Sequence, residues 1–77
     1  MSQSVHLLRC DPARNMARFY SLELCRTLFG EVVLIRRWGR IGTYGRWQET
    51  VLVQQSEGEV ILRSWQQRKE RRGYRPA

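Results

Sequence analysis

Residues 32–54 read VVLIRRWGRIGTYGRWQETVLVQ, and this stretch decides which fold the chain can adopt. It opens with a β-branched run over residues 32–38, which predicts a strand. Residues 42–45, Gly-Thr-Tyr-Gly, have the composition of a turn, and residues 46–54 predict a further strand. Two strands joined by so short a turn are expected to pair as an antiparallel hairpin.

Two more strands are predicted upstream of this hairpin. In residues 17–27, Tyr20, Leu22 and Leu24 alternate with polar or smaller side chains, which is typical of a strand with one face in a core. A turn at residues 28–31, with Gly30 at its sharp position, separates it from the strand at 32–38. Residues 4–10 predict a first strand, and residues 11–15 a connection.

A helix is predicted downstream of the hairpin. Ser56 and Glu59 have the spacing of a capping box. The apolar residues Val60, Ile61, Leu62 and Trp65 then follow at helical spacing, so they are expected to face the sheet, with Trp65 in the core. The helix is expected to run to about residue 72 and to end at Gly73, with Pro76 just beyond.

Together these elements predict an α+β fold: a small antiparallel meander of about four strands, with one C-terminal helix packed on one face. The length of 77 residues allows one small domain over residues 1–77, with a core at about residues 4–75.

The charge is strongly one-sided. The net charge is +7, and thirteen arginines stand against one lysine. The planar guanidinium grips phosphate with two hydrogen bonds and stacks on rings, so this composition favours a nucleic-acid partner. A GC-rich genome would also raise the ratio of arginine to lysine, but it accounts less well for the net charge. The basic side chains near the helix end, Arg68 to Arg75, also complement the helix dipole.

The sequence gives no support for an enzyme, a metal centre or a cofactor. His6, the single histidine, lies in a predicted strand with no nucleophile placed beside it, and we interpret it as a half-buried strand residue. Cys10 and Cys25 do not have zinc-ligand spacing and are expected to be free thiols. No signal peptide or membrane span is recognisable, so we expect a cytoplasmic protein, associated with the nucleoid if it binds DNA. A membrane and a small-molecule substrate are not among the expected partners.

The candidate binding surface lies in residues 36–47. Trp38 and Arg40 are two residues apart at a strand end, so they are predicted to project from the same face as an indole with a cation beside it. Gly39 would leave the other side bare for a close approach. We interpret Trp47 as structural, because it begins a strand. The candidate nucleic-acid-binding residues are Arg36, Arg37, Trp38, Gly39, Arg40, Tyr44 and Arg46.

Trp38-Gly39-Arg40, with Ile41-Gly42 and Gly45 after it, resembles the signature of the WGR domain, best known from the poly(ADP-ribose) polymerases and found in bacterial proteins alone or fused. Residues 15–20, Asn-Met-Ala-Arg-Phe-Tyr, are similar to the entry of that family's second strand. The helix with Lys69 and the closing Gly73-Tyr74 also fit, so the resemblance covers about residues 4–75 of what we take to be a standalone bacterial copy.

The resemblance implies a non-catalytic module that binds DNA near strand breaks, with Trp38 packed on a sugar and Arg40 as the cationic centre. Our first hypothesis is therefore binding of duplex DNA ends or nicks. The alternative is a protein–protein adaptor that uses the same Trp/Arg surface, since interface hot spots favour these residue types. A purely structural domain whose charge keeps it in solution is the third reading.

Overall fold

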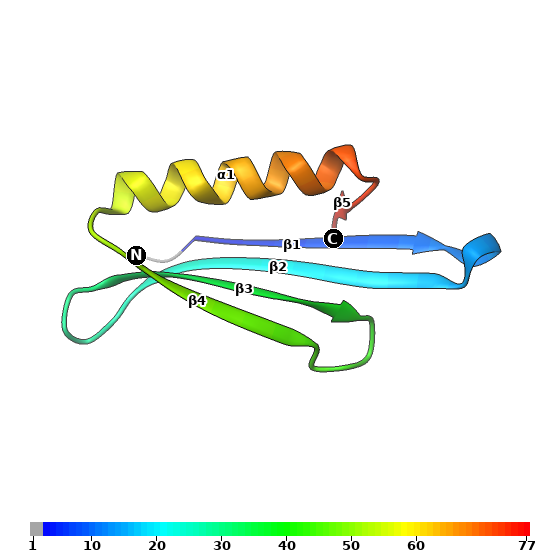
Figure 1. The fold of residues 1–77 in the computed structure, drawn as a ribbon, viewed down its shortest axis with the longest axis horizontal. Coiled ribbons are helices and arrows are strands. Elements are labelled where there is room, and N and C mark those ends of the chain that lie inside the picture. The colour runs from blue at the N-terminus through cyan, green and yellow to red at the C-terminus, as the bar shows by residue number, and fades with distance from the viewer. Residues whose placement is uncertain (1–2) are drawn as a thin grey trace.

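One antiparallel sheet with a helix on one of its faces makes up residues 3–77, the part of the chain that the computed structural model describes (Figure 1). The strands lie in the order β4-β3-β2-β1-β5, and neighbouring strands run antiparallel. The predicted α+β class and the C-terminal helix are confirmed. The elements are β1 (Gln3–Asp11), a 3-10 turn (Pro12–Arg14), β2 (Met16–Arg26), β3 (Val32–Arg40), β4 (Arg46–Leu52), α1 (Gln55–Arg71) and β5 (Arg75–Pro76).

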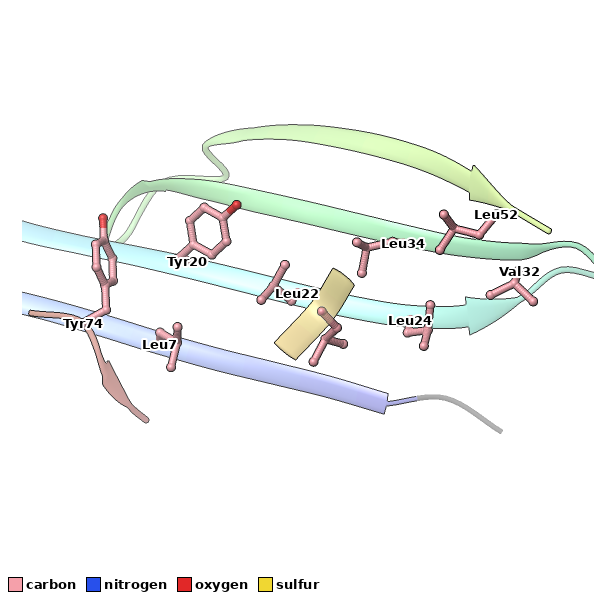
Figure 2. Packing of buried hydrophobic residues seen from close by; sticks show 9 residues of the cluster. Leu7, Tyr20, Leu22, Leu24, Val32, Leu34, Leu52 and Tyr74 are labelled. Atoms are coloured by element: carbon pink, nitrogen blue, oxygen red, sulfur yellow. The ribbon is translucent and has the colours of Figure 1, made fainter. Parts of the chain in front are cut away.

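The core lies between the helix and the sheet. Leu7, Leu22 and Leu34 come from three adjacent strands, are fully buried, and gather on the same side (Figure 2). The predicted inward face of β2 is confirmed, because Tyr20, Leu22 and Leu24 are all buried. Alternation along each strand assigns every neighbouring residue to the opposite side of the sheet. We call the side under α1 the helix side and the other side the open face.

The β2–β3 hairpin has the register that its turn predicts. Thr27 donates its backbone N–H to the Glu31 carbonyl at 2.9 Å, and Gly30 takes the positive φ of 83° that closes the turn. Arg26 then pairs with Val32, and each further rung follows in order up to Arg18 opposite Arg40. The β3 strand is therefore two residues longer than predicted and extends through the Trp-Gly-Arg tripeptide.

The helix begins earlier than the predicted capping box would allow. Gln54 is the N-cap residue, and no side chain caps the helix end. Ser56 Oγ donates to the Gln54 side-chain carbonyl at 3.4 Å, so the predicted contact between Ser56 and Glu59 is wrong. The Gly58 N–H already donates to the Gln54 carbonyl at 3.3 Å, which forms the first turn before Ser56 could cap it. Val60, predicted to face the sheet, is 67% exposed.

The helix ends as predicted, but the chain then adds a strand that the sequence did not suggest. Gly73 has φ +99°, and the Gly73 and Tyr74 N–H groups donate to the Glu70 and Lys69 carbonyls, which is a Schellman motif. Tyr74 is buried in the core cluster. The following β5 strand pairs with Leu7 and Leu8 of β1. Two residues, one of them proline, give no periodic signal, although proline is tolerated on such an edge strand.

Within residues 3–77, no helix combines the length and the apolar character that crossing a membrane would require.

Candidate functional site

The alternation of β3 divides the candidate residues between the two sides of the sheet. Trp38 pairs with Tyr20 and Arg40 pairs with Arg18, so these side chains lie on the helix side. Arg37 pairs with Ser21 and lies on the open face, together with Tyr44 from the turn. The seven candidates therefore do not form one continuous patch.

Trp38 is half-buried at the edge of the core. Its ring stacks on Tyr20, with ring centroids 6.2 Å apart and an angle of 22° between the planes. Tyr20 also stacks on Trp65, which packs against the outside of the core cluster. One part of the indole is therefore fixed by packing, and the other part remains available at the surface.

Arg36 is held by its neighbours on the helix side. Its guanidinium lies 4.2 Å from the Trp65 ring centroid and 5.5 Å from that of Trp38. It also donates to the Tyr20 hydroxyl at 3.2 Å and to the Gln48 side-chain carbonyl. These two hydrogen bonds and two ring contacts hold the guanidinium in place, so Arg36 supports the aromatic cluster rather than offering a free cation. Arg46, opposite Trp38 on β4, is exposed.

Arg40 is exposed but positioned. Its Nη1 donates to the Asn15 backbone carbonyl at 3.3 Å, and its Nη2 donates to Asn15 Oδ1 at 3.4 Å. Asn15 has a left-handed backbone with φ 52°, a conformation that asparagine tolerates better than most residues. The turn between β1 and β2 therefore holds the guanidinium of Arg40 on β3 through these two hydrogen bonds, which we call the Asn15 bracket.

Three arginines form one row across the sheet. Arg9 of β1 lies opposite Arg18 of β2, and Arg18 lies opposite Arg40 of β3. Like charges directly opposite one another are unfavourable in a sheet. Within residues 3–77, the single side-chain ion pair joins Arg14 to Asp11, so no carboxylate forms an ion pair with this row. The arrangement leaves a band of positive charge past the C-terminal end of α1.

Beside this row lies a hollow of about 400 Å³, which we call the basic hollow. The helix contributes Lys69 to it, with Nζ 4.6 Å from the Tyr20 ring centroid and 5.7 Å from that of Tyr74. Burial, and then the charges of Arg72, Arg36, Arg68 and Arg18, lower the pKa of Lys69 below its ordinary value. The residues lining the basic hollow are Arg18, Tyr20, Trp38, Gly39, Arg40, Lys69 and Tyr74.

Trp38, Gly39 and Arg40 were named among the candidates from the sequence, whereas Arg9, Arg18, Lys69 and Tyr74 were not. The hairpin register offered a signal for Arg18, because a turn that pairs residue 26 with 32 must also pair 18 with 40. Tyr74 and Lys69 reach the hollow only through the packing of α1 on the sheet, which is a tertiary contact that no local pattern specifies.

Gly39 does not provide an opening for a ligand, as the sequence had suggested. A Cβ at residue 39 would lie 2.8 Å from the Cα of Gly45, so the chain's own turn occupies that side. Gly45 in turn has φ +78°, and a Cβ there would collide with the Trp38 carbonyl. Gly39 and Gly45 are therefore needed so that the backbone of β3 and that of the following turn can lie close together.

On the open face, Arg37 is stacked between two rings, 5.2 Å from the Phe19 centroid and 5.0 Å from that of Tyr44. Trp47, opposite Arg37 on β4, is 54% exposed and belongs to no buried cluster. The interpretation of Trp47 as structural is therefore wrong, because β4 is an edge strand with no layer covering its open face. Tyr44 is likewise exposed.

His6 and the cysteines also lie near this face. His6 is exposed rather than half-buried, and it stacks on Phe19 with ring centroids 6.2 Å apart. Cys10 and Cys25 are free thiols at opposite ends of the β1/β2 pair. Burial, followed by the charges of Glu23 and Glu49, raises the pKa of Cys25, which makes its thiol less reactive.

The chain is thus a small antiparallel sheet with a cationic and aromatic hollow beside its single described helix. The family model of the WGR domain matches residues 3–77, and the chain belongs to the WGR domain family. WGR domains are non-catalytic modules that are often associated with nucleic-acid binding.

One curated relative is a protein of Sinorhizobium fredii (strain NBRC 101917 / NGR234) called "Uncharacterized protein y4dW". It is 39% identical to this chain over 72 residues, which is 94% of this chain and 35% of the relative. The chain thus spans about a third of the length of that protein. No solved structure matches the chain.

Proposed function

We propose that the chain binds duplex DNA at ends or nicks through the basic hollow. The observation that carries this proposal is the unneutralised row of Arg9, Arg18 and Arg40 beside a half-buried indole. An anionic ligand would relieve the repulsion within the row, and phosphate accepts the paired hydrogen bonds that guanidinium offers.

The shape of the hollow favours an end over a continuous duplex. Trp38 and Tyr20 form a stacked pair, and Lys69 stands over Tyr20 from the helix. Such a site suits a terminal phosphate together with the uncovered face of the sugar or base beside it, and an uninterrupted duplex has neither a terminal phosphate nor an unstacked base face. No helix of this fold is placed to read base edges in the major groove, so binding is expected to depend on DNA structure and not on sequence.

The test compares three DNAs by fluorescence anisotropy at moderate salt: a 5′-phosphorylated blunt duplex, the same duplex without the phosphate, and a closed dumbbell. Wild type is expected to prefer the phosphorylated end. Trp38→Ala should lose about five- to 150-fold in affinity for it, the equivalent of about 1–3 kcal/mol for one stacked ring. Arg40→Ala should remove most of the preference for the phosphate.

Two matched variants control for charge and for loss of aromatic surface. Arg63 is exposed on the helix, and Tyr44 is exposed on the open face, so Arg63→Ala and Tyr44→Ala should bind almost as wild type does. Circular dichroism must show native folding for Trp38→Ala, because Trp38 packs against the core. Equal binding of ended and closed DNA, unchanged by Trp38→Ala, would rule out end recognition.

A further inference from the structure

The open face of the sheet carries apolar surface that the fold leaves uncovered. Trp47, Val51 and Tyr44 are 54%, 59% and 68% exposed. The helix lies entirely on the other side of the sheet (Figure 1). A hollow of about 380 Å³ lies on the surface of this face, with Ile35 and Arg37 among its lining residues. Exposed apolar area of this kind, bordered by charges, is typical of a docking surface.

Arg37 stands at the centre of this face with its donors uncommitted. Its guanidinium lies over the rings of both Phe19 and Tyr44, which restrict its movement. Its Nε is buried, and no residue among 3–77 accepts a hydrogen bond from it. A carboxylate or a similar group from another molecule could accept hydrogen bonds from the remaining N–H groups at the tip of this guanidinium.

The sheet sorts its charges by side. Arg9, Arg18, Arg36, Arg40 and Arg46 lie on the helix side by the register of their strands. The two glutamates within strands, Glu23 and Glu49, lie on the open face, one on each side of Ile35. No ion pair within residues 3–77 involves either of them. The open face therefore combines one unpaired cation with two unpaired carboxylates, which would repel a nucleic acid.

We infer that the open face binds a second copy of this chain. The open face carries an unpaired guanidinium and unpaired carboxylates, which could pair with one another between two copies. A two-fold symmetric interface uses the same patch on each copy, so it would bring these opposite charges together. Arg37 lies one same-face position along β3 from Ile35, about 7 Å away. A two-fold axis between the sheets, perpendicular to the strands and midway between these positions, sets each Arg37 over Ile35 of the other copy. The guanidinium then reaches between Glu23 and Glu49 of that copy.

Such packing of one sheet on another would cover Trp47, Tyr44 and Val51, with the usual spacing of about 10 Å between the sheets. Both helices would lie on the outside, and the two basic hollows would face in opposite directions. The dimer does not depend on the proposed nucleic-acid function, because no residue of the basic hollow takes part in it.

The test is a charge exchange, followed by sedimentation equilibrium of the whole chain at moderate salt and at concentrations up to about 1 mM, which detects even weak pairs. Wild type is expected to dimerise. Arg37→Glu alone, and the double change Glu23→Arg/Glu49→Arg alone, should each weaken the dimer by at least about tenfold through like-charge contacts. An equimolar mixture of the two variants should restore a dimer, because each Arg or Glu then meets its opposite.

Arg63→Glu and Glu57→Arg make comparable charge changes on the exposed surface of the helix and should leave the dimer unchanged. Since Arg37→Glu removes two stacking contacts, its thermal unfolding is compared with that of wild type. The glutamate double variant tests the interface independently. A chain that stays monomeric throughout, or a dimer that survives both variants, overturns the proposal. So does a mixture that fails to associate.

Discussion

The guanidinium of Arg40 and Asn15 form a two-point contact, in which Arg40 donates once to the Asn15 backbone carbonyl and once to its side-chain carbonyl. Asn15 accepts both bonds while its backbone is in the left-handed region. The contact connects the β1–β2 turn to the end of β3. An arginine on a strand end would otherwise sample many rotamers, and this bracket holds its charge beside Trp38.

The side-chain half of this contact can be removed in two ways that differ at the backbone. Asn15→Gly keeps the left-handed conformation and deletes only the side-chain acceptor, so we expect nearly unchanged stability and about a three- to tenfold loss of affinity for DNA ends. Asn15→Ala deletes the same acceptor and strains the turn, so it should also lower the free energy of unfolding by about 1 kcal/mol. Anisotropy titration and urea unfolding separate the two effects. Unchanged affinity in both variants would mean that Arg40 needs no positioning by the Asn15 side chain.

Salt dependence counts the cations that meet phosphate. If three to five phosphates are neutralised, the logarithm of the binding constant should fall with the logarithm of salt concentration at a slope of about −3 to −4.5. Arg18→Gln, in the middle of the arginine row, should reduce this slope by about one. Arg63→Gln removes an equal charge from the outer surface of the helix and should leave the slope almost unchanged. A wild-type slope near zero would contradict the electrostatic account.

Lys69 links stability to pH. Burial and the surrounding arginines lower its pKa in the folded protein, so between that pKa and the ordinary value the unfolded chain binds more protons. The free energy of unfolding therefore rises with pH across that interval. As the pH falls through the folded pKa, this gain is lost, because Lys69 is then charged in both the folded and the unfolded chain. Lys69→Met keeps the apolar stem, so it should unfold at the same or a higher temperature than wild type at neutral pH. The difference should shrink as the pH rises toward the ordinary lysine pKa.

The same variant should bind DNA more weakly, with a salt slope reduced by about one, because a phosphate in the basic hollow favours charged Lys69. Higher stability combined with lower affinity is the signature of a residue retained for binding. Arg71→Met, on the exposed end of the helix, serves as the comparison. If Lys69→Met lowers stability and leaves affinity intact, the lysine is structural.

Gly58 sets how closely α1 lies on the sheet. A Cβ at this position would lie 2.5 Å from Leu24 Cδ1 and 3.0 Å from Leu52 Cδ1. Leu24 is fully buried and has little room to move, so Gly58→Ala should cost about 1–3 kcal/mol in packing. Alanine recovers about 1 kcal/mol of helix propensity, which leaves a net loss of about 1 kcal/mol in urea unfolding. Ser64→Ala, at an exposed position of the same helix, should instead raise the free energy of unfolding by a few tenths of a kcal/mol.

The sequence predicted the fold well where the pattern is periodic. Alternation in residues 20–24, the glycine turns and the helix stop at Gly73 all specify local geometry that the structure retains. The capping box failed because the contact of Gly58 with the sheet, a tertiary constraint, determines where the first helical turn forms. The β5 strand could not be predicted, because its pairing with β1 depends on the path that the chain takes after α1.

The candidate site was predicted only as a stretch of chain. Its composition pointed to Trp38 and Arg40, and the structure sets both beside the basic hollow. Arg37 and Tyr44 were grouped with them because they are close in sequence, yet a strand sends alternate residues to opposite sides. Arg9 and Lys69 are distant in sequence from this stretch, and only strand pairing and helix packing bring them to the site.

The alternation in β3 also bears on how this protein can change over evolutionary time. One strand encodes two surfaces in interleaved positions, with Trp38 and Arg40 on one and Ile35 and Arg37 on the other. Substitutions at Ile35 or Arg37 can alter what the open face meets while the basic hollow keeps its lining, and substitutions at Trp38 or Arg40 alter the hollow while the open face is kept. Insertion of a single residue within the strand would exchange the two surfaces at once. Lineages should therefore change each surface by substitution at these positions and place their insertions in the turns.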